Sequence, residues 1–269
     1  MKLMKSYKKV VITGAASGIG AALVARFAAE GASIVASDRN EVALRNVANR
    51  YNCNHITADV SVPSDVSSLA EKSWKSLGGV DLLCLNAGVS GPHKPAWERS
   101  VEEWNWVLGP NLWGLIHGIQ SFVPRMIEQG TPSAILITAS AAGFLSSPFG
   151  ADYLASKHAA VSIAESIAQE FQSLQLPIDV RVLCPGFVRT NILRTMRDRF
   201  GAQLDAERES QLTRYESLLE ASPSPEEVVD IAFRLWDEGA FYLMTHPELD
   251  TYVERRHAAI SARRLPELA

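Results

Sequence analysis

The stretch VVITGAASGIG, residues 10–20, joins a short β-branched run to a helical pattern that continues to Gly31. The run predicts a β-strand, and the pattern after it predicts an α-helix. Gly14 would allow a tight turn between them, a bare backbone at Gly18 would let a phosphate group approach, and Gly20 would let the helix pack closely on the sheet. The N-terminus of the helix would then face the phosphate charge. Three glycines alone are a weak signal, because turns that lead into helices often contain them.

Strands and helices alternate along most of the chain. Further strands are predicted at the apolar runs 33–36, 55–57, 82–85, 134–137, 178–183 and 241–244. Helices are predicted at about residues 40–50, 63–78, 101–129, 151–174 and 225–239, followed by a polar helical tail. The strands are apolar on both faces, which is typical of a parallel sheet covered by helices on each side. We therefore predict one α/β domain over residues 1–269 with a doubly wound parallel sheet.

One segment interrupts this alternation. Residues 186–222 are charged and helix-prone, and they contain no strand pattern. They predict a helical, mobile insertion or lid within the same domain, because no linker rich in proline, glycine or serine divides the chain.

The composition limits the classes of partner. The chain has 269 residues, of which 47% are hydrophobic and 21% charged, with a formal net charge of -4 and a sequence pI near 5.9. These values argue against nucleic acid or an anionic membrane as the main partner. The N-terminus lacks the apolar segment of a signal peptide, and we expect no membrane span. Three separated cysteines predict a reduced, cytoplasmic protein, and the histidines lack metal-ligand spacing, so we expect no metal.

Asp38 ends the second predicted strand, 18 residues after Gly20. A carboxylate there can accept both hydroxyls of an adenosine ribose but repels a 2′-phosphate. Ser17 agrees with this, since a basic residue in that part of the loop could have held the phosphate, whereas Arg39 could swing toward one. We therefore predict NAD as the cofactor, with NADP as the alternative. A second interpretation makes Asp38 a helix N-cap beside Asn40.

Two more strand ends carry candidate cofactor contacts. Asp59 and Val60 could hold the edge of the adenine, although Asp59 could equally cap the helix that begins at Pro63. The segment Asn86-Ala87-Gly88 puts small residues where the backbone must pass close to a cofactor, and a plain turn is the alternative there.

Tyr153 and Lys157 are four residues apart in a predicted helix, so their side chains share one face. A free tyrosine has a pKa near 10, and a neighbouring ammonium and an oxidised nicotinamide would both favour its phenolate. Lowering this pKa by about three units requires roughly 4 kcal/mol, which implies a partly enclosed site. Ser140 ends the fifth predicted strand, where its hydroxyl could stabilise a substrate oxygen.

These residues form a joint pattern with three further segments. Its parts, in order, are Thr13-Gly14-x-x-x-Gly18-x-Gly20, Asn86-Ala87-Gly88, Asn111, Ser140, Tyr153-x-x-x-Lys157, and Pro185-Gly186 with Thr190. The pattern resembles the short-chain dehydrogenase/reductase family over about residues 8–192. This resemblance implies a Rossmann-type single domain, NAD(P)-linked hydride transfer to or from a small-molecule alcohol or ketone, and a homodimer or homotetramer.

The resemblance also implies roles for single residues. Tyr153 would be the general acid/base, and Ser140 would orient the substrate oxygen. Lys157 would lower the pKa of Tyr153 and hold the nicotinamide ribose, and Asn111 would fix a water molecule that links Lys157 to solvent. The segment that would support the nicotinamide carboxamide contains Pro185, Gly186 and Thr190, and the expected cofactor contacts also include Ile19 and Val188.

Two features depart from the family pattern. Gly109-Pro110 directly precedes Asn111, where the family continues a helix, and the proline predicts a kink. The C-terminal part lacks the glycine-rich ending of the acyl-carrier-protein reductases of this family, which argues against a role in fatty-acid synthesis.

Aromatic residues gather around the predicted catalytic segments, and they are Trp97, Trp104, Trp106, Trp113, Phe144, Phe149 and Phe187. We assign the three phenylalanines to the substrate pocket, because such a pocket suits a bulky, weakly polar ligand. The helical segments with Trp104, Trp106 and Phe122 resemble family members that oxidise aryl or lignin-derived secondary alcohols. Packing in the core or at a subunit interface is the alternative for the tryptophans.

The hypothesis is therefore a dehydrogenase of a hydrophobic secondary alcohol, aromatic ones included. One alternative is an NADPH-dependent ketone reductase, decided by Asp38 and Arg39. The other is a dinucleotide-sensing binding protein without catalysis, which would not need an acid/base group such as Tyr153.

Overall fold

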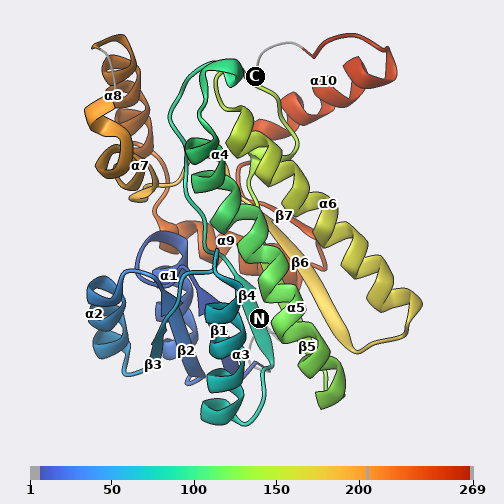
Figure 1. The fold of residues 1–269 in the computed structure, drawn as a ribbon. Helices are drawn as coiled ribbons and strands as arrows, with labels where there is room; N and C mark the ends of the chain where they lie inside the picture. Colours follow the sequence, from blue (N-terminus) through green and yellow to red (C-terminus); the bar gives the residue numbers. More distant parts are fainter. Residues whose placement is uncertain (1–6, 204–205, 267–269) are drawn as a thin grey trace.

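The computed structural model describes residues 7–203 and 206–266, apart from the side chains of residues 203, 206 and 207. Within this part of the chain, seven strands form one parallel sheet in the order β3-β2-β1-β4-β5-β6-β7 (Figure 1). The strands are β1 (Lys9–Thr13), β2 (Ser33–Asp38), β3 (Asn54–Thr57), β4 (Leu82–Leu85), β5 (Ser133–Thr138), β6 (Ile178–Cys184) and β7 (Tyr242–Met244). The prediction of a doubly wound parallel sheet is confirmed, and the strand bounds agree to within two residues, with the largest difference at the end of β2.

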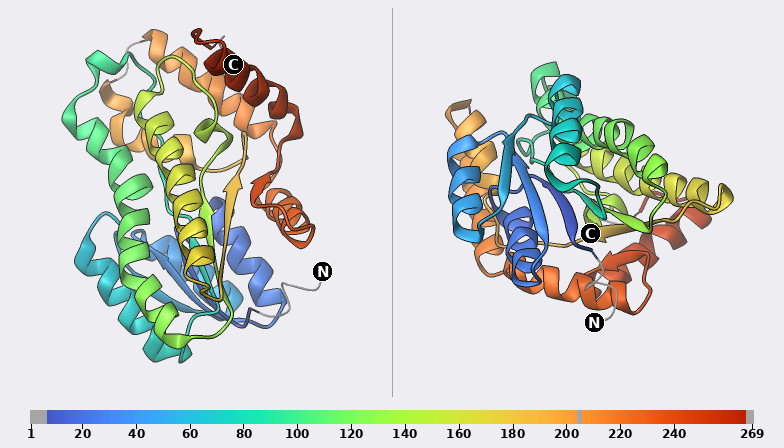
Figure 2. Two further views of the ribbon diagram at one scale, coloured as in Figure 1. Left: turned by 90° about the vertical axis from the view of Figure 1, so that its right-hand side faces the viewer. Right: turned by 90° about the horizontal axis from the view of Figure 1, so that it is seen from below.

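Helices cover both faces of the sheet (Figures 1 and 2). They are α1 (Gly18–Ala29), α2 (Glu41–Tyr51), α3 (Pro63–Leu77), α4 (Val101–Leu108), α5 (Gly114–Gln129), α6 (Ala151–Ser173), α7 (Ile192–Phe200), α8 (Ala206–Glu220), α9 (Pro225–Asp237) and α10 (Asp250–Ser261). One core cluster packs α3, α5 and α6 against the sheet, and the other packs α1, α2 and α9. Alternate residues of β1 show this division, since Val11 belongs to the first cluster and Val10 and Ile12 to the second.

The order of the strands places a ligand site. β1 pairs with β2 on one side and with β4 on the other, so successive crossovers run in opposite directions from β1. The ends of β1 and β4 at this point are followed by the glycine segment after Thr13 and by the turn at Asn86. Ligands of open α/β sheets bind outside the carboxyl ends of the strands at such a switch point.

The long helical region predicted at 101–129 is divided into α4, a π-helical turn η3 (Gly109–Trp113) and α5. Pro110 lies in the first turn of η3, and the wider turn accommodates the proline that the sequence associates with a kink. Asn111 is thereby placed in a π turn, a geometry often associated with functional sites.

The segment after β6 folds into α7 and α8, which lie side by side next to α4 at the upper left of Figure 1. They form a small core of their own, in which Met196, Phe200 and Leu212 pack with Trp106 of α4. The helical character predicted for residues 186–222 is thus found in the described residues.

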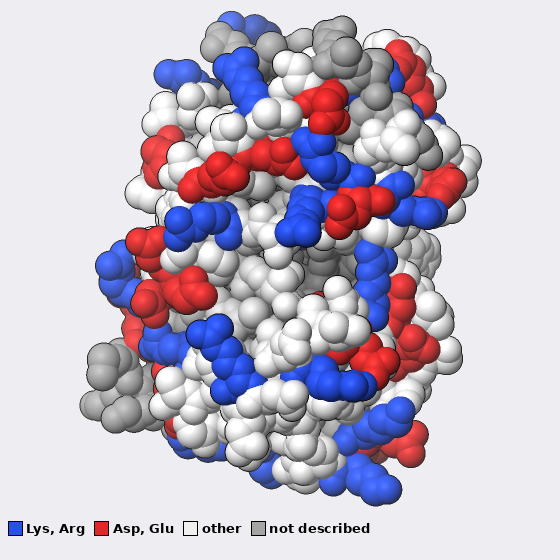
Figure 3. Space-filling view, turned by 90° about the vertical axis from the view of Figure 1, so that its left-hand side faces the viewer, with Lys and Arg blue, Asp and Glu red and all other residues white. Residues whose placement is uncertain are grey.

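The face on this side of the molecule intersperses positive and negative side chains (Figure 3). No helix among the described residues is long and apolar enough to cross a membrane.

Candidate active site

The glycine segment forms a tight backbone cradle between β1 and α1. Gly14 and Gly18 have positive φ angles, 66° and 53°, which favour glycine. A Cβ on Gly20 would lie 2.0 Å from the carbonyl oxygen of Gly14, and one on Gly14 would lie 2.8 Å from Cα of Ala87. Any residue other than glycine at position 20 would therefore require a rearrangement of the loop.

The N-terminus of α1 fits an anionic group. Its N-cap is Ser17, whose side chain makes no capping hydrogen bond, and the first turn contains no acidic residue. The first N–H groups of a helix lack partners inside the helix and carry its positive dipole end. The residues present therefore fit the pyrophosphate of a dinucleotide. The side chain of Ile19 is partly buried and packs against the core beside this helix start.

Asp38 fixes the position of the cradle. Its carboxylate accepts hydrogen bonds from the backbone N–H of Ala16 at 3.1 Å and of Asn40 at 2.9 Å. The N-cap of α2 is Asn40, whose side chain accepts from the N–H of Ala43 at 3.1 Å, so the interpretation of Asp38 as that cap is wrong. Asp38 is partly exposed at the end of β2.

Arg39 extends in another direction. Its guanidinium lies 4.5 Å from the ring centroid of Trp106, and the Trp106 indole N–H donates to the carbonyl of Ser90 at 3.1 Å. The same ring meets Phe200 of α7 edge-on at 5.8 Å. Trp106 therefore joins the end of β2 to α4 and α7.

Asp59 makes hydrogen bonds with nearby residues of its own loop and of the start of α3. Its carboxylate accepts from the N–H of Ser61 at 2.9 Å, and its N–H donates to Asp65 at 3.0 Å. The N-cap of α3 is Val62, without a side-chain cap, so the prediction of Asp59 as a cap is wrong. Val60 is 8% exposed, and its carbonyl lies 2.9 Å from a ring nitrogen of His117.

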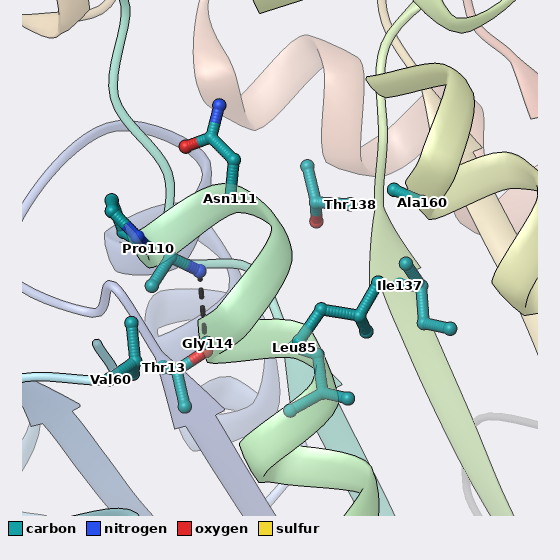
Figure 4. Close-up of a pocket in the computed structure, with 11 residues that line it drawn as sticks. Thr13, Val60, Leu85, Pro110, Asn111, Gly114, Ile137, Thr138 and Ala160 are labelled. Carbon is teal, nitrogen blue, oxygen red and sulfur yellow. Dashed lines mark hydrogen bonds between the residues drawn. The ribbon is translucent and has the colours of Figure 1, made fainter. Parts of the chain in front are cut away.

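The turn Asn86-Ala87-Gly88 connects three strands. The amide of Asn86 donates to the carbonyl of Thr13 at 3.1 Å and accepts from the hydroxyl of Thr138 at 3.1 Å. The N–H of Ala87 donates to Thr13 Oγ1 at 3.2 Å (dashed line in Figure 4). The plain-turn alternative is therefore insufficient, because the turn holds β1, β4 and β5 together.

A small cavity lies behind this turn, between the sheet and α5 and α6 (Figure 4). Most of its lining is apolar, and its polar side chains are Thr13, Asn111 and Thr138. Asn111 is 4% exposed, and its amide binds the N–H of Val89 at 2.8 Å, the carbonyl of Val89 at 3.0 Å and Ser156 Oγ at 3.0 Å. One lone pair of its Oδ1 stays unused.

Asn111 and Lys157 flank the same glycine. A Cβ on Gly88 would lie 3.2 Å from Asn111 Oδ1 and 3.5 Å from Lys157 Nζ. The ammonium of Lys157 donates to the carbonyl of Thr138 at 3.1 Å. Lys157 is 4% exposed, and burial lowers the pKa of its ammonium from 10.5 to about 8.

Tyr153 lies between Lys157 and Ser140. Lys157 Nζ is 5.6 Å from the centroid of the Tyr153 ring. Burial raises the pKa of Tyr153, and a hydrogen bond with Ser140 opposes this. The protein alone thus holds the tyrosine in its neutral form, in contrast to the lowered pKa that its neighbouring ammonium suggests, because the desolvation of the phenol outweighs its favourable contacts.

Ser140 links the tyrosine to the segment after β6. Its hydroxyl donates to the carbonyl of Pro185 at 3.2 Å and accepts from the N–H of Ala142 at 3.1 Å. The same segment reaches the glycine cradle, since a Cβ on Gly18 would lie 3.1 Å from the methyl of Thr190. Val188 is buried between these two points. The structure therefore brings the predicted catalytic and cofactor residues to one edge of the sheet.

The predicted pocket phenylalanines separate into two groups. Phe144 packs on the core and meets Tyr242 edge-on at 5.5 Å. Phe149 is 43% exposed and lies 5.1 Å from the ring of His93, and Phe187 is 52% exposed and lies 6.4 Å from the ring of Tyr215.

His93 and Tyr215, which the sequence did not single out for the pocket, lie 5.3 Å apart between these two phenylalanines. Phe149, His93, Tyr215 and Phe187 form what we call the aromatic mouth. Of the four tryptophans, Trp97 and Trp113 are exposed, which excludes them from the core of this chain.

A buried ion pair, also missed from the sequence, supports the start of α6. Arg99 and Asp152 have side chains that are 0% and 1% exposed, with 2.5 Å between Arg99 Nη1 and Asp152 Oδ2. Arg99 also donates to the carbonyl of Phe149 at 2.6 Å, and Asp152 accepts from the N–H of Tyr153 at 2.8 Å. Nothing in residue spacing marks this pair, because Arg99 follows a short 3-10 turn and Asp152 lies in the first turn of α6, far apart in the sequence.

Comparisons with known proteins agree with this geometry. The family model described as short chain dehydrogenase matches residues 8–200. The chain is 30% identical to the CLA biosynthesis dehydrogenase/reductase of Lactiplantibacillus plantarum, over 98% of each chain. It is 34% identical to the 1-deoxy-11-beta-hydroxypentalenate dehydrogenase of Streptomyces exfoliatus, over 90% of this chain and 84% of that one. A structure of a short chain dehydrogenase/reductase from Burkholderia phymatum in complex with NAD has a TM-score of 0.89 at 33% identity, covering 97% of this chain and 96% of that one.

Proposed function

Since the chain belongs to the short-chain dehydrogenase/reductase family, and is an NAD(P)-dependent oxidoreductase acting on hydroxyl or ketone groups, we propose that it oxidises a hydrophobic secondary alcohol with NAD. One observation carries this proposal. Ser140, Tyr153 and Lys157 converge at the carboxyl edge of the sheet, beside a glycine cradle at the start of α1 whose N-cap side chain makes no hydrogen bond.

The proton chemistry follows from Tyr153. Its phenolate takes the proton of the substrate hydroxyl, and in the reverse direction its phenol returns that proton to the oxygen. NAD, which the glycine cradle and Asp38 would hold, would supply the acceptor for the hydride that leaves the carbon carrying the hydroxyl. Ser140 would turn its single hydroxyl hydrogen from the carbonyl of Pro185 to the substrate oxygen and hold that oxygen while the carbonyl forms.

Lys157 and Asn111 assist the transfer of the proton that Tyr153 takes from the substrate. The positive charge of Lys157, close to the Tyr153 ring, stabilises the phenolate, and its ammonium holds the ribose of the cofactor. The unused lone pair of Asn111 binds a water molecule through which the proton reaches solvent. Burial raises the pKa of Tyr153, and Lys157 would need the added positive charge of an oxidised nicotinamide to offset that rise.

The cofactor preference rests on Asp38 and Arg39. The partly exposed carboxylate of Asp38 lies at the end of β2, beside the cradle, where it would accept the ribose hydroxyls and repel a 2′-phosphate. Arg39, which could bind that phosphate, is engaged by Trp106 instead. We therefore assign NAD, with an NADPH-dependent ketone reductase as the second candidate that Arg39 keeps open.

The aromatic mouth supports a hydrophobic substrate. Phe149 and Phe187 present exposed rings, and His93 has a lowered pKa from burial, so it is neutral at pH 7. Such a surface favours apolar or aromatic groups over charged ones. The Streptomyces relative, which is named as a dehydrogenase of a hydroxypentalenate, agrees with a hydroxyl on a carbon-rich substrate.

The helices α7 and α8 are proposed as a lid. Tyr215 of α8 contributes to the mouth, and Gln211 lies 3.0 Å from His93 Nδ1. Exposed ion pairs join the lid to the α4 region, with Arg199 bound to Glu102 and Arg208 to Glu98. Exposed ion pairs each contribute about 0–1 kcal/mol, so they hold such a lid only weakly, and opening would also have to separate its small apolar core from Trp106.

We also propose a cytoplasmic homodimer or homotetramer. Trp113, directly before α5, and Ile127, in the last turn of α5, are 53% and 40% exposed. Long apolar helices suit a helix-on-helix interface. Light scattering on the purified protein tests this, and a monomer at micromolar concentration would contradict it.

The central experiment compares NADH and NADPH in a fluorescence titration of the purified protein. NADH binding at least about tenfold tighter, which is 1.4 kcal/mol, is expected. A panel of secondary alcohols with NAD then identifies the substrate. Tighter binding of NADPH would favour the ketone reductase, and binding without turnover of any alcohol or ketone would favour a dinucleotide sensor.

A further inference from the structure

The segment Pro185–Thr190 is held from behind by a single histidine of the C-terminal region. His246 follows β7 and is 7% exposed. Its Nδ1 accepts a hydrogen bond from the N–H of Gly186 at 3.0 Å, and its Nε2 lies 2.9 Å from the carbonyl oxygen of Phe187. One imidazole thus binds the backbone of two successive residues in the segment.

These contacts fix the chemical form of the ring. A carbonyl oxygen only accepts, so Nε2 carries the hydrogen, and an N–H only donates, so Nδ1 is the acceptor. The hydroxyl of Thr245 lies 2.9 Å from the same Nδ1. His246 therefore acts as a neutral imidazole with its hydrogen on Nε2.

The packing is as close as the hydrogen bonding. A Cβ on Gly186 would lie 2.9 Å from Cγ of His246 and 2.9 Å from Cδ1 of Leu249. Glycine at 186 thus allows the backbone to lie directly on the imidazole. The same stretch of backbone accepts the hydroxyl of Ser140 at the carbonyl of Pro185.

We propose that His246 is a positioning residue that sets the backbone of Pro185–Phe187 against the nicotinamide half of the cofactor. The inference rests on the proposed function, because it requires that this segment supports the nicotinamide. His246 acts through Gly186 and Phe187, whose backbone groups it binds, and the preceding carbonyl of Pro185 accepts from the hydroxyl of Ser140. Loss of its hydrogen bonds would loosen the nicotinamide end of the site and leave the adenosine end, at Asp38 and Gly14, as it is.

Three substitutions separate the contacts. His246→Phe keeps a ring against Gly186 but removes both hydrogen bonds. His246→Asn keeps an acceptor near the position of Nδ1, and His246→Gln can place an N–H near the position of Nε2. His55→Phe is the matched control, because His55 is exposed on the edge strand β3.

The test measures by calorimetry how each protein binds NADH and ADP-ribose, which lacks the nicotinamide. In His246→Phe we expect about a tenfold loss in NADH affinity, or 1.4 kcal/mol, and less than a twofold change for ADP-ribose. His246→Asn should recover part of the loss, and His55→Phe should match the parent protein. If His246→Phe fails to fold, the Asn and Gln variants provide the same comparison.

The outcomes distinguish this inference from the proposed function. Equal losses for NADH and ADP-ribose, or no loss for either, would overturn the positioning role while leaving the proposed function intact. A parent protein that binds NADH no more tightly than ADP-ribose would also overturn it. A parent protein that binds neither would contradict the proposed function itself.

Discussion

Arg39 and Trp106 are joined by a cation–π contact, with 4.5 Å between the guanidinium carbon and the ring centroid. The contact links the residue after the proposed ribose ligand Asp38 to helix α4. Arg39, the basic side chain next to Asp38, is thus bound to the Trp106 ring rather than left to bind a phosphate group.

Replacing Trp106 with alanine should therefore weaken the selectivity for NAD. A cation–π contact at an exposed site contributes about 0.5–1 kcal/mol, so the ratio of the NADPH and NADH dissociation constants should fall about two- to fivefold. Fluorescence titration of both cofactors measures this ratio. Trp97→Ala is the control, because Trp97 is 85% exposed, and an unchanged ratio in Trp106→Ala would show that Arg39 is not restrained by this ring.

Replacing Tyr153 with phenylalanine should lower kcat by roughly 10²-fold or more, the range of general acid–base effects. Affinity for NADH should change little, because the ring and Lys157 remain. Steady-state rates and a fluorescence titration measure the two quantities. Tyr252→Phe, on the exposed face of α10, should behave as the parent enzyme, and a Tyr153→Phe enzyme with near-normal turnover would remove Tyr153 from its proposed role.

Lys157 should reduce the stability of the unliganded protein. Its folded pKa of about 8 lies below the usual 10.5, so between these values the unfolded chain binds the extra proton. The penalty is complete below pH 8, shrinks as the pH rises to 10.5 and is absent above it. At 1.36 kcal/mol per pKa unit it amounts to about 3 kcal/mol at pH 7.

Lys157→Met should accordingly raise the free energy of unfolding at pH 7 while it abolishes most of the activity. Urea denaturation at several pH values measures the difference, which should narrow from pH 8 upward. Lys72→Met, on the exposed side of α3, should show no such trend. A constant difference across this pH range would mean that the Lys157 ammonium is not destabilised by burial.

Arg99→Met should destabilise the protein by about 3–5 kcal/mol, because it leaves Asp152 as a buried carboxylate without its ion-pair partner. Burial already raises the pKa of Asp152, and the Arg99 charge opposes that rise. Chemical denaturation measures the loss, with Arg45→Met as the control for an exposed pair with Glu41. Adding Asp152→Asn to Arg99→Met should restore part of the stability, and equal losses in the Arg99 and Arg45 variants would contradict the prediction.

Local patterns predicted the strands of the sheet and the turn of the glycine cradle well, because the sequence signal of each lies in residues close together in the chain. Gly14 and Gly20, for example, touch within a single turn. The aromatic mouth and the contact between Arg39 and Trp106 depend on how distant loops meet, and no spacing encodes that.

Two misassignments have a related origin. Asp38 and Asp59 both precede helices, which favours a cap. The N-cap of α2 is instead Asn40, two positions after Asp38, and that of α3 is Val62, three positions after Asp59, without a side-chain hydrogen bond. The pKa of Tyr153 depends on its burial, which only the packed structure reveals. The spacing of His246 argues against a metal site and indicates no other role. Its contacts with Gly186 and Phe187 arise because β7, which precedes His246, pairs with β6, which precedes Gly186.

The uncapped start of α1 connects the occupancy of the site with the lifetime of the fold. Ser17 leaves the first N–H groups of that helix without a side-chain partner, so a bound anion completes the helix rather than merely resting on it. A ligand that binds only the folded chain adds about 2.7 kcal/mol of stability at one hundred times its dissociation constant. The concentration of dinucleotide around the protein would then set how long each molecule resists unfolding and proteolysis.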